Sequence, residues 1–68
     1  MEIKMNVKTT ATINDRTACL YEIESEVTNI YIVEQETKDG ETKRFLFDND
    51  KANAEKKYRA IVKKMIAE

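Results

Sequence analysis

The stretch "NIYIVEQ", from Asn29 to Gln35, contains four consecutive apolar residues, Ile30 to Val33. Successive side chains of a β-strand point to opposite faces of its sheet. A strand in a small antiparallel sheet with one solvated face is expected to alternate apolar and polar residues. This run is apolar in every position, so it predicts a strand that has to exclude water from both of its faces.

Four segments of the chain carry the alternation and the β-branched residues that are typical of strands. They are residues 3–13, 17–24, 27–36 and 42–47. Turn-forming residues separate the segments: "NDR" at 14–16, a weaker signal near Ser25 and Glu26, and the pair Asp39-Gly40. An Asp-Gly pair favours a two-residue type I′ hairpin.

The last segment has a helical period. Its apolar residues recur at steps of three, four and one, and they are Ala54, Tyr58, Ile61, Val62 and Met65. The "DND" that precedes them, 48–50, offers side chains that cap a helix N-terminus. We therefore predict a helix over about 50–67 and a single domain over 1–68. Its fold class is α+β, a four-stranded antiparallel β-meander with one C-terminal helix packed on one face (ββββα).

A three-residue loop at 14–16, an even loop at Ser25-Glu26 and the Asp39-Gly40 turn give one consistent register. This register predicts that the helix covers a face made of Ile3, Met5, Val7, Ala11, Ile13, Cys19, Tyr21, Ile23, Ile30, Ile32, Phe45 and Phe47. The opposite face then keeps an apolar island of Leu20, Tyr31, Val33 and Leu46 that the helix does not reach.

The composition excludes several kinds of chemistry. The chain has no histidine, one cysteine and one glycine. Without histidine it lacks the usual general base, Ser–His and Cys–His pairs and histidine-containing zinc sites. One cysteine cannot form a four-thiolate metal site, and one glycine cannot form a glycine-rich phosphate loop. We expect no enzymatic activity, no metal and no cofactor.

The lone cysteine, Cys19, is predicted to be a small buried core residue. A chain that forms no intramolecular disulfide suits a reducing compartment, and no apolar run reaches membrane-spanning length. We expect a cytoplasmic protein with no membrane contact.

The apolar island is the candidate binding site. The partner-binding residues would be Leu20, Tyr31, Val33 and Leu46, with Arg44 and Glu22 at the rim and Tyr31 as the aromatic anchor. The occupant would be a protein partner or a second copy of the chain. The nine lysines against three arginines suggest an AT-rich coding genome. Short, motif-free chains of this kind are often encoded by phages or mobile elements as inhibitors or regulators of host proteins, and we expect such a role here.

Nucleic-acid binding is the alternative hypothesis. Residues 51–68 carry six basic and two acidic side chains, whereas residues 1–50 carry six basic and eleven acidic ones. Lys56, Arg59 and Lys63 share one helix face, and clustered cations neutralise phosphates. The chain as a whole has a net charge of −1, so we rank this accessory DNA- or RNA-binding role below protein binding.

The segment from Tyr31 to about Ile66 loosely resembles the three-strand-plus-helix arm-binding domains of some integrases. The order of a hairpin, then "RFLFDNDKANAEKKY", then a helix carries this resemblance. It implies DNA contact through strand residues. Among the strand residues here, Lys43 and Arg44 fit that role, while most of the basic positions such a surface needs are absent.

Overall fold

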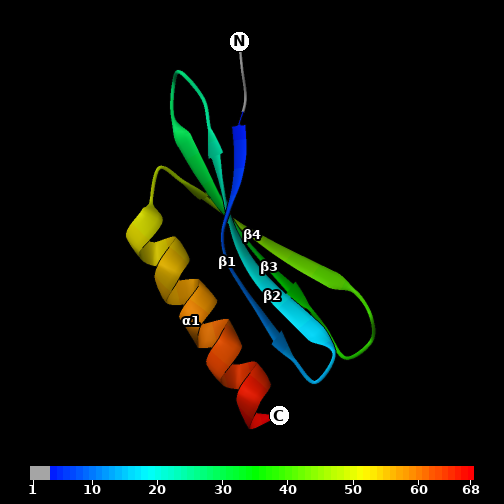
Figure 1. Ribbon diagram of the computed structural model, residues 1–68. Helices are drawn as coiled ribbons and strands as arrows, with labels where there is room; N and C mark the ends of the chain where they lie inside the picture. The colour runs from blue at the N-terminus through cyan, green and yellow to red at the C-terminus, as the bar shows by residue number, and fades with distance from the viewer. Residues whose placement is uncertain (1–3) are drawn as a thin grey trace.

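The computed structural model describes residues 4–68, which form one antiparallel sheet and one helix. The strands are β1 (Lys4–Ile13), β2 (Arg16–Glu24), β3 (Asn29–Glu36) and β4 (Thr42–Asp48), and the helix is α1 (Lys51–Ala67). Neighbouring strands pair in sequence order, and α1 lies along one side of the twisted sheet (Figure 1). The predicted ββββα fold is confirmed. Every predicted boundary inside the described residues lies within two residues of the observed one.

The β1–β2 connection is shorter than predicted. Ile13 pairs with Arg16, so the turn has two central residues, Asn14 and Asp15, with φ of 52° and 64°. A type I′ turn requires positive φ at both positions, and Asn and Asp tolerate it best after glycine. The predicted three-residue loop is therefore wrong, because Arg16 belongs to β2.

A β-bulge interrupts β1. The pairing with β2 shifts between Val7 and Thr9, which leaves Lys8 as an extra residue. A bulge changes the face to which the following residues point. Met5 and Val7 consequently lie on one face of the sheet, and Ala11 and Ile13 lie on the other, although the sequence alternates without interruption.

The β2–β3 loop is longer than predicted, without changing the faces. Tyr21 pairs with Ile32, and Glu24 pairs with Asn29. The Ser25 hydroxyl donates to the carbonyl of Thr28 at 2.7 Å and closes the loop. The register differs from the predicted one by two residues, and an even shift keeps every side chain on its face.

The β3–β4 register differs by one residue, which does change the faces. Ile32 pairs with Leu46 and not with Phe47. The loop runs from Thr37 to Glu41, and the amide of Thr37 donates to the carbonyl of Glu41 at 2.8 Å. Gly40, with φ of 83°, sits inside this longer loop and not in a two-residue turn.

Helix α1 covers the face that carries Leu20, Tyr31 and Val33, which we call the helix-covered face. The core there consists of Ala18, Leu20, Tyr31, Val33, Ala54, Ile61 and Met65, with Ile13, Phe45, Phe47, Tyr58 and Val62 packed against it. The helical stripe therefore lies on the side predicted for it. The same is true of four strand residues, Ala11, Ile13, Phe45 and Phe47. The one-residue shift of β4 places Phe45 opposite Val33 and Phe47 opposite Tyr31, on the face that the helix covers.

For the other residues that it placed under the helix, the prediction is wrong. Some residues were predicted to lie on the sheet face under the helix but in fact point away from it. They are Met5, Val7, Cys19, Tyr21, Ile23, Ile30 and Ile32. They belong to what we call the uncovered face. Ile3 lies outside the described residues.

One side chain caps the helix, and two further contacts fix it to the sheet. The Asp50 carboxylate caps α1 by accepting from the amide of Asn53, within the helix, at 3.2 Å. At the other end, Arg16 and Glu68 form an ion pair at 2.6 Å. Between them, the Lys57 ammonium lies 4.4 Å from the centre of the Phe45 ring. These contacts hold α1 on one face and leave the other open.

Two leucines test which face is the core. Leu20 is 4% exposed and Leu46 is 66% exposed. We expect Leu20→Ala to lower the free energy of unfolding by about 2–5 kcal/mol, because it leaves a cavity under the helix. Leu46→Ala should change it by about 0.5 kcal/mol or less. Urea unfolding followed by circular dichroism in dilute solution measures both, and equal losses in the two variants would contradict this assignment of faces.

Candidate functional site

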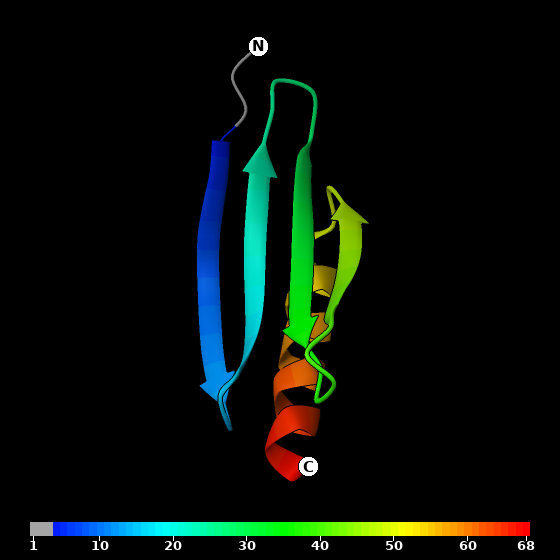
Figure 2. The same cartoon turned by 90° about the vertical axis from the view of Figure 1, so that its right-hand side faces the viewer.

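The uncovered face consists of four rows of side chains, with one residue from each strand in a row. Residues directly opposite each other in paired strands point to the same face, so the pairing defines the rows. Numbered from the end near the β2–β3 loop, row 1 is Met5, Ile23, Ile30 and Asp48; row 2 is Val7, Tyr21, Ile32 and Leu46; row 3 is Thr10, Cys19, Glu34 and Arg44; row 4 is Thr12, Thr17, Glu36 and Thr42. Figure 2 looks onto this face, with α1 behind the sheet.

Apart from Asp48 at the β4 edge of row 1, rows 1 and 2 form an apolar area that reaches solvent. Val7 is 61% exposed and Leu46 is 66% exposed, at opposite edges of row 2. Between them, Tyr21 and Ile32 are partly buried. Met5, Tyr21, Ile32, Glu34 and Arg44 line a shallow depression of about 330 Å³. The depression therefore joins the apolar rows to a charged pair.

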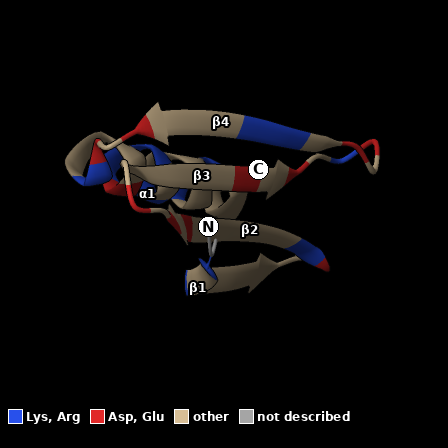
Figure 3. Ribbon diagram, turned by 90° about the horizontal axis from the view of Figure 1, so that it is seen from above, with Lys and Arg blue, Asp and Glu red and all other residues tan. Residues whose placement is uncertain are grey.

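Row 3 is polar and connected. The Thr10 hydroxyl and the Cys19 thiol lie 3.2 Å apart, within hydrogen-bonding distance. At the other end of the row, the Arg44 guanidinium donates to the Glu34 carboxylate and forms an ion pair with it. Figure 3 shows the blue segment of β4 beside the red segment of β3 at this point. Polar contacts thus mark one end of the apolar area.

Tyr21 joins row 2 to row 3. Hydrogen bonding raises the pKa of the Tyr21 phenol to about 12; the Cys19 side chain is the larger cause and the Glu34 carboxylate is the next. Both partners favour the neutral phenol over the phenolate. The ring therefore presents its apolar body to row 2 and its hydroxyl to row 3.

Two of the six predicted partner-binding residues, Leu46 and Arg44, lie on the uncovered face, and both are exposed. Leu20, Tyr31 and Val33 lie under the helix, with Tyr31 7% exposed and Val33 fully buried. Their placement on an open surface is wrong, because the register of β4 differs from the predicted one and because β1 contains a bulge that was not predicted.

The sixth residue, Glu22, is buried on the helix-covered face and is not at an exposed rim. Its carboxylate forms an ion pair at 3.0 Å with Lys8, the extra residue of the bulge. Hydrogen bonds from Lys8 and then from the Tyr31 hydroxyl lower the pKa of Glu22. The same carboxylate raises the pKa of Tyr31. Glu22 thus belongs to a polar cluster that supports the core.

Apart from Leu46, sequence reasoning did not assign the apolar members of rows 1 and 2 to the surface; the missed residues are Met5, Val7, Tyr21, Ile23, Ile30 and Ile32. The available signal was the dipeptide Asn14-Asp15. Both residues tolerate positive φ, and a two-residue turn there implies a different register from a three-residue loop. The bulge at Lys8 has no such local signal.

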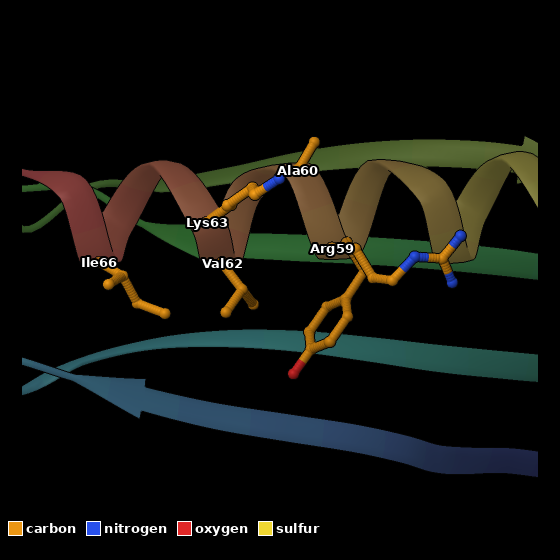
Figure 4. A pocket seen from close by; sticks show the side chains of 6 residues that line it. Arg59, Ala60, Val62, Lys63 and Ile66 are labelled. Atoms are coloured by element: carbon orange, nitrogen blue, oxygen red, sulfur yellow. The ribbon is translucent and has the colours of Figure 1, made fainter.

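A second hollow, of about 500 Å³, lies along the helix. It is lined by Tyr58, Arg59, Ala60, Val62, Lys63 and Ile66. Figure 4 shows Val62 and Ile66 pointing from α1 toward the side of β1 and β2. Lys56, Arg59 and Lys63 are exposed, and none of them forms an ion pair within residues 4–68. The predicted basic helix face therefore exists as a solvent-exposed group of cations.

Residues 4–68 contain neither a cluster of potential metal ligands nor a helix that could cross a membrane. No group of three or more His, Cys, Asp or Glu side chains is arranged there to hold a metal ion. No helix in that part of the chain is both long enough and apolar enough to cross a membrane. Comparisons with protein-family models, with curated proteins and with solved structures find no match for this chain.

The connection between Tyr21 and row 3 can be tested by titration. We expect Tyr21 to titrate near pH 12, and Glu34→Gln to lower its pKa, because the variant removes a negative charge and leaves the Arg44 cation nearby. Nuclear magnetic resonance of ¹³Cζ-labelled tyrosine measures this, with the methyl spectrum showing that the chain stays folded. Glu36→Gln, on the same strand and face, is the matched control. An unchanged Tyr21 pKa in Glu34→Gln would contradict the contact.

Proposed function

We propose that this chain is a small, non-enzymatic protein-interaction module that binds a partner protein through the uncovered face of its sheet. The single observation that carries the proposal is the apolar character of rows 1 and 2, which the helix leaves open. A solvated face of an antiparallel sheet is ordinarily polar. Here Val7 and Leu46, more than half exposed, flank Tyr21 and Ile32 in one continuous row.

The residue types of this face match those of protein interfaces. Tyrosine, methionine and arginine are enriched at such surfaces, where an apolar centre is surrounded by a polar rim. Tyr21 occupies the centre, Met5 lies in the adjoining row, and Arg44 lies at the polar end. Tyr21 replaces Tyr31 as the expected aromatic anchor, since Tyr31 is part of the core.

The role of the module as an inhibitor or regulator of a host protein, encoded by a phage or mobile element, belongs to the same proposal. Its support is the small size and composition of the chain. A cytoplasmic location is proposed on the ground that Cys19 is a buried, unpaired thiol, as suits a reducing compartment.

Affinity capture with matched variants tests the proposed function. Leu46 and Ile66 have nearly the same exposure, 66% and 67%, but Leu46 lies on the uncovered face and Ile66 lies on the helix. Leu46→Glu places a charge on the proposed interface and should weaken capture of the partner at least tenfold, because the charge would be desolvated there. Ile66→Glu should leave capture unchanged. Quantitative mass spectrometry of proteins retained from a host lysate measures both.

The proposal fails if the tagged wild-type chain, Leu46→Glu and Ile66→Glu retain the same proteins in the same amounts. It also fails if Ile66→Glu abolishes capture and Leu46→Glu does not, since the hollow along α1 would then be the binding surface. Both substituted positions are exposed, so both variants are expected to fold.

Nucleic-acid binding through α1 is a second candidate, favoured by the exposed cations Lys56, Arg59 and Lys63, which form no ion pair with another residue of 4–68. If it occurs, we expect it to be weak and steeply salt-dependent, because the contacts would be made to phosphates. Changing all three residues to alanine should abolish a mobility shift seen at low salt. Tight, sequence-specific binding would rank this function above protein binding, and a shift that persists in the triple variant would remove α1 from it.

A further inference from the structure

We propose that the partner of the uncovered face is a second copy of this chain, packed face to face about a two-fold axis that runs along the strands between β2 and β3. This inference rests on the proposed function, since it names the occupant of the same surface. The resulting dimer has two sheets in its centre and the two α1 helices on the outside, because each helix lies on the far side of its own sheet (Figure 2).

The rows of the face are self-complementary under this axis. A two-fold interface brings residue i of one copy onto residue j of the other, and j onto i. Rotation about an axis along the strands places β1 over β4 of the second copy and β2 over β3. In row 2, Val7 then faces Leu46, and Tyr21 faces Ile32, so two apolar contacts each form twice from one row. Strand directions stay nearly aligned, as in common sheet-on-sheet packing.

The distribution of charge selects this axis over one perpendicular to the strands. The charged side chains of rows 1 to 4 all come from β3 and β4, and they are Glu34, Glu36, Arg44 and Asp48. The β1 and β2 residues in these rows are uncharged. An axis along the strands therefore places every charged residue of these rows over an uncharged residue of the second copy, so no acidic residue meets another. A perpendicular axis would press the polar rows 3 and 4 against the apolar rows 1 and 2.

The size of the face is sufficient for a specific dimer. Four strands about 4.8 Å apart and four rows about 6.6 Å apart span roughly 19 by 26 Å, or about 500 Å². The total accessible surface of the described chain is 4875 Å², so the face is about a tenth of it, the fraction typical of a small protein's interface. Two copies would bury about 1,000 Å², which reaches the lower limit for a specific association.

Molar-mass measurement by light scattering after size exclusion tests the dimer. We expect the wild-type chain to have twice the 7.9 kDa mass of one chain when it is measured at about 100 μM. This concentration suits an interface of micromolar affinity. Leu46→Glu and Val7→Lys should each weaken the dimer about a hundredfold or more, because each change occurs twice and puts a charge against an apolar residue. Ile66→Glu should leave the dimer unchanged.

A double variant identifies the geometry. Val7 and Leu46 belong to the outer strands β1 and β4, about 14 Å apart across the sheet, so they do not touch within one chain. Across the proposed two-fold axis they face each other. The Val7→Lys/Leu46→Glu variant would place two Lys–Glu pairs in the interface, and we expect it to recover at least a tenfold gain in affinity over either single variant.

The outcomes separate this inference from the proposed function. A wild-type chain with the mass of one copy at this concentration overturns the dimer, while loss of a different captured protein in Leu46→Glu would still support the proposed function. A dimer that survives Leu46→Glu and Val7→Lys forms through another surface, such as a strand edge, and also overturns the inference. Single variants that dissociate without recovery in the double variant overturn the proposed axis.

Discussion

The architecture depends on one constraint: a single helix can cover only one face of a sheet whose central strands are apolar on both. In β2 and β3, Leu20 and Val33 point to one side, and Tyr21 and Ile32 point to the other. Helix α1 buries the first pair together with Ile61 and Met65. The second pair is left at the surface of a small chain that has no further helix among its described residues. The candidate site is therefore the part of the apolar sheet that remains after the core is complete.

Small differences between the predicted and the observed connections determine which pair the helix covers. One residue fewer in the Asn14-Asp15 turn, the extra Lys8 in β1 and a one-residue shift of β4 each move side chains across the sheet. A strand has a period of two, so an odd shift reverses every residue in it. The shift of β4 placed Phe45 opposite Val33 and Phe47 opposite Tyr31, on the face where the helix packs.

The polar side chains of both sheet faces are arranged consistently with the helix covering the face of Leu20 and Val33. Under the helix, the buried Glu22 carboxylate is neutralised by Lys8 and hydrogen-bonded by Tyr31, so the core contains no unpaired charge there. On the uncovered face, Arg44 pairs with Glu34 at the end of the apolar rows. The charged members of that face lie on β3 and β4 alone. This asymmetry gives the apolar surface a direction, which a two-fold partner can match.

The sequence by itself determined the number, type and order of the elements, the capped helix and its apolar stripe, because alternation, helical period and capping are local properties of neighbouring residues. It also identified Leu46 and Arg44 as surface residues and β3 as apolar on both sides. Only the tertiary structure decided which face Tyr31 and Tyr21 occupy. That choice depends on the lengths of three connections and on one bulge, and a difference of a single residue there costs little locally but moves a whole strand face from the solvent to the core.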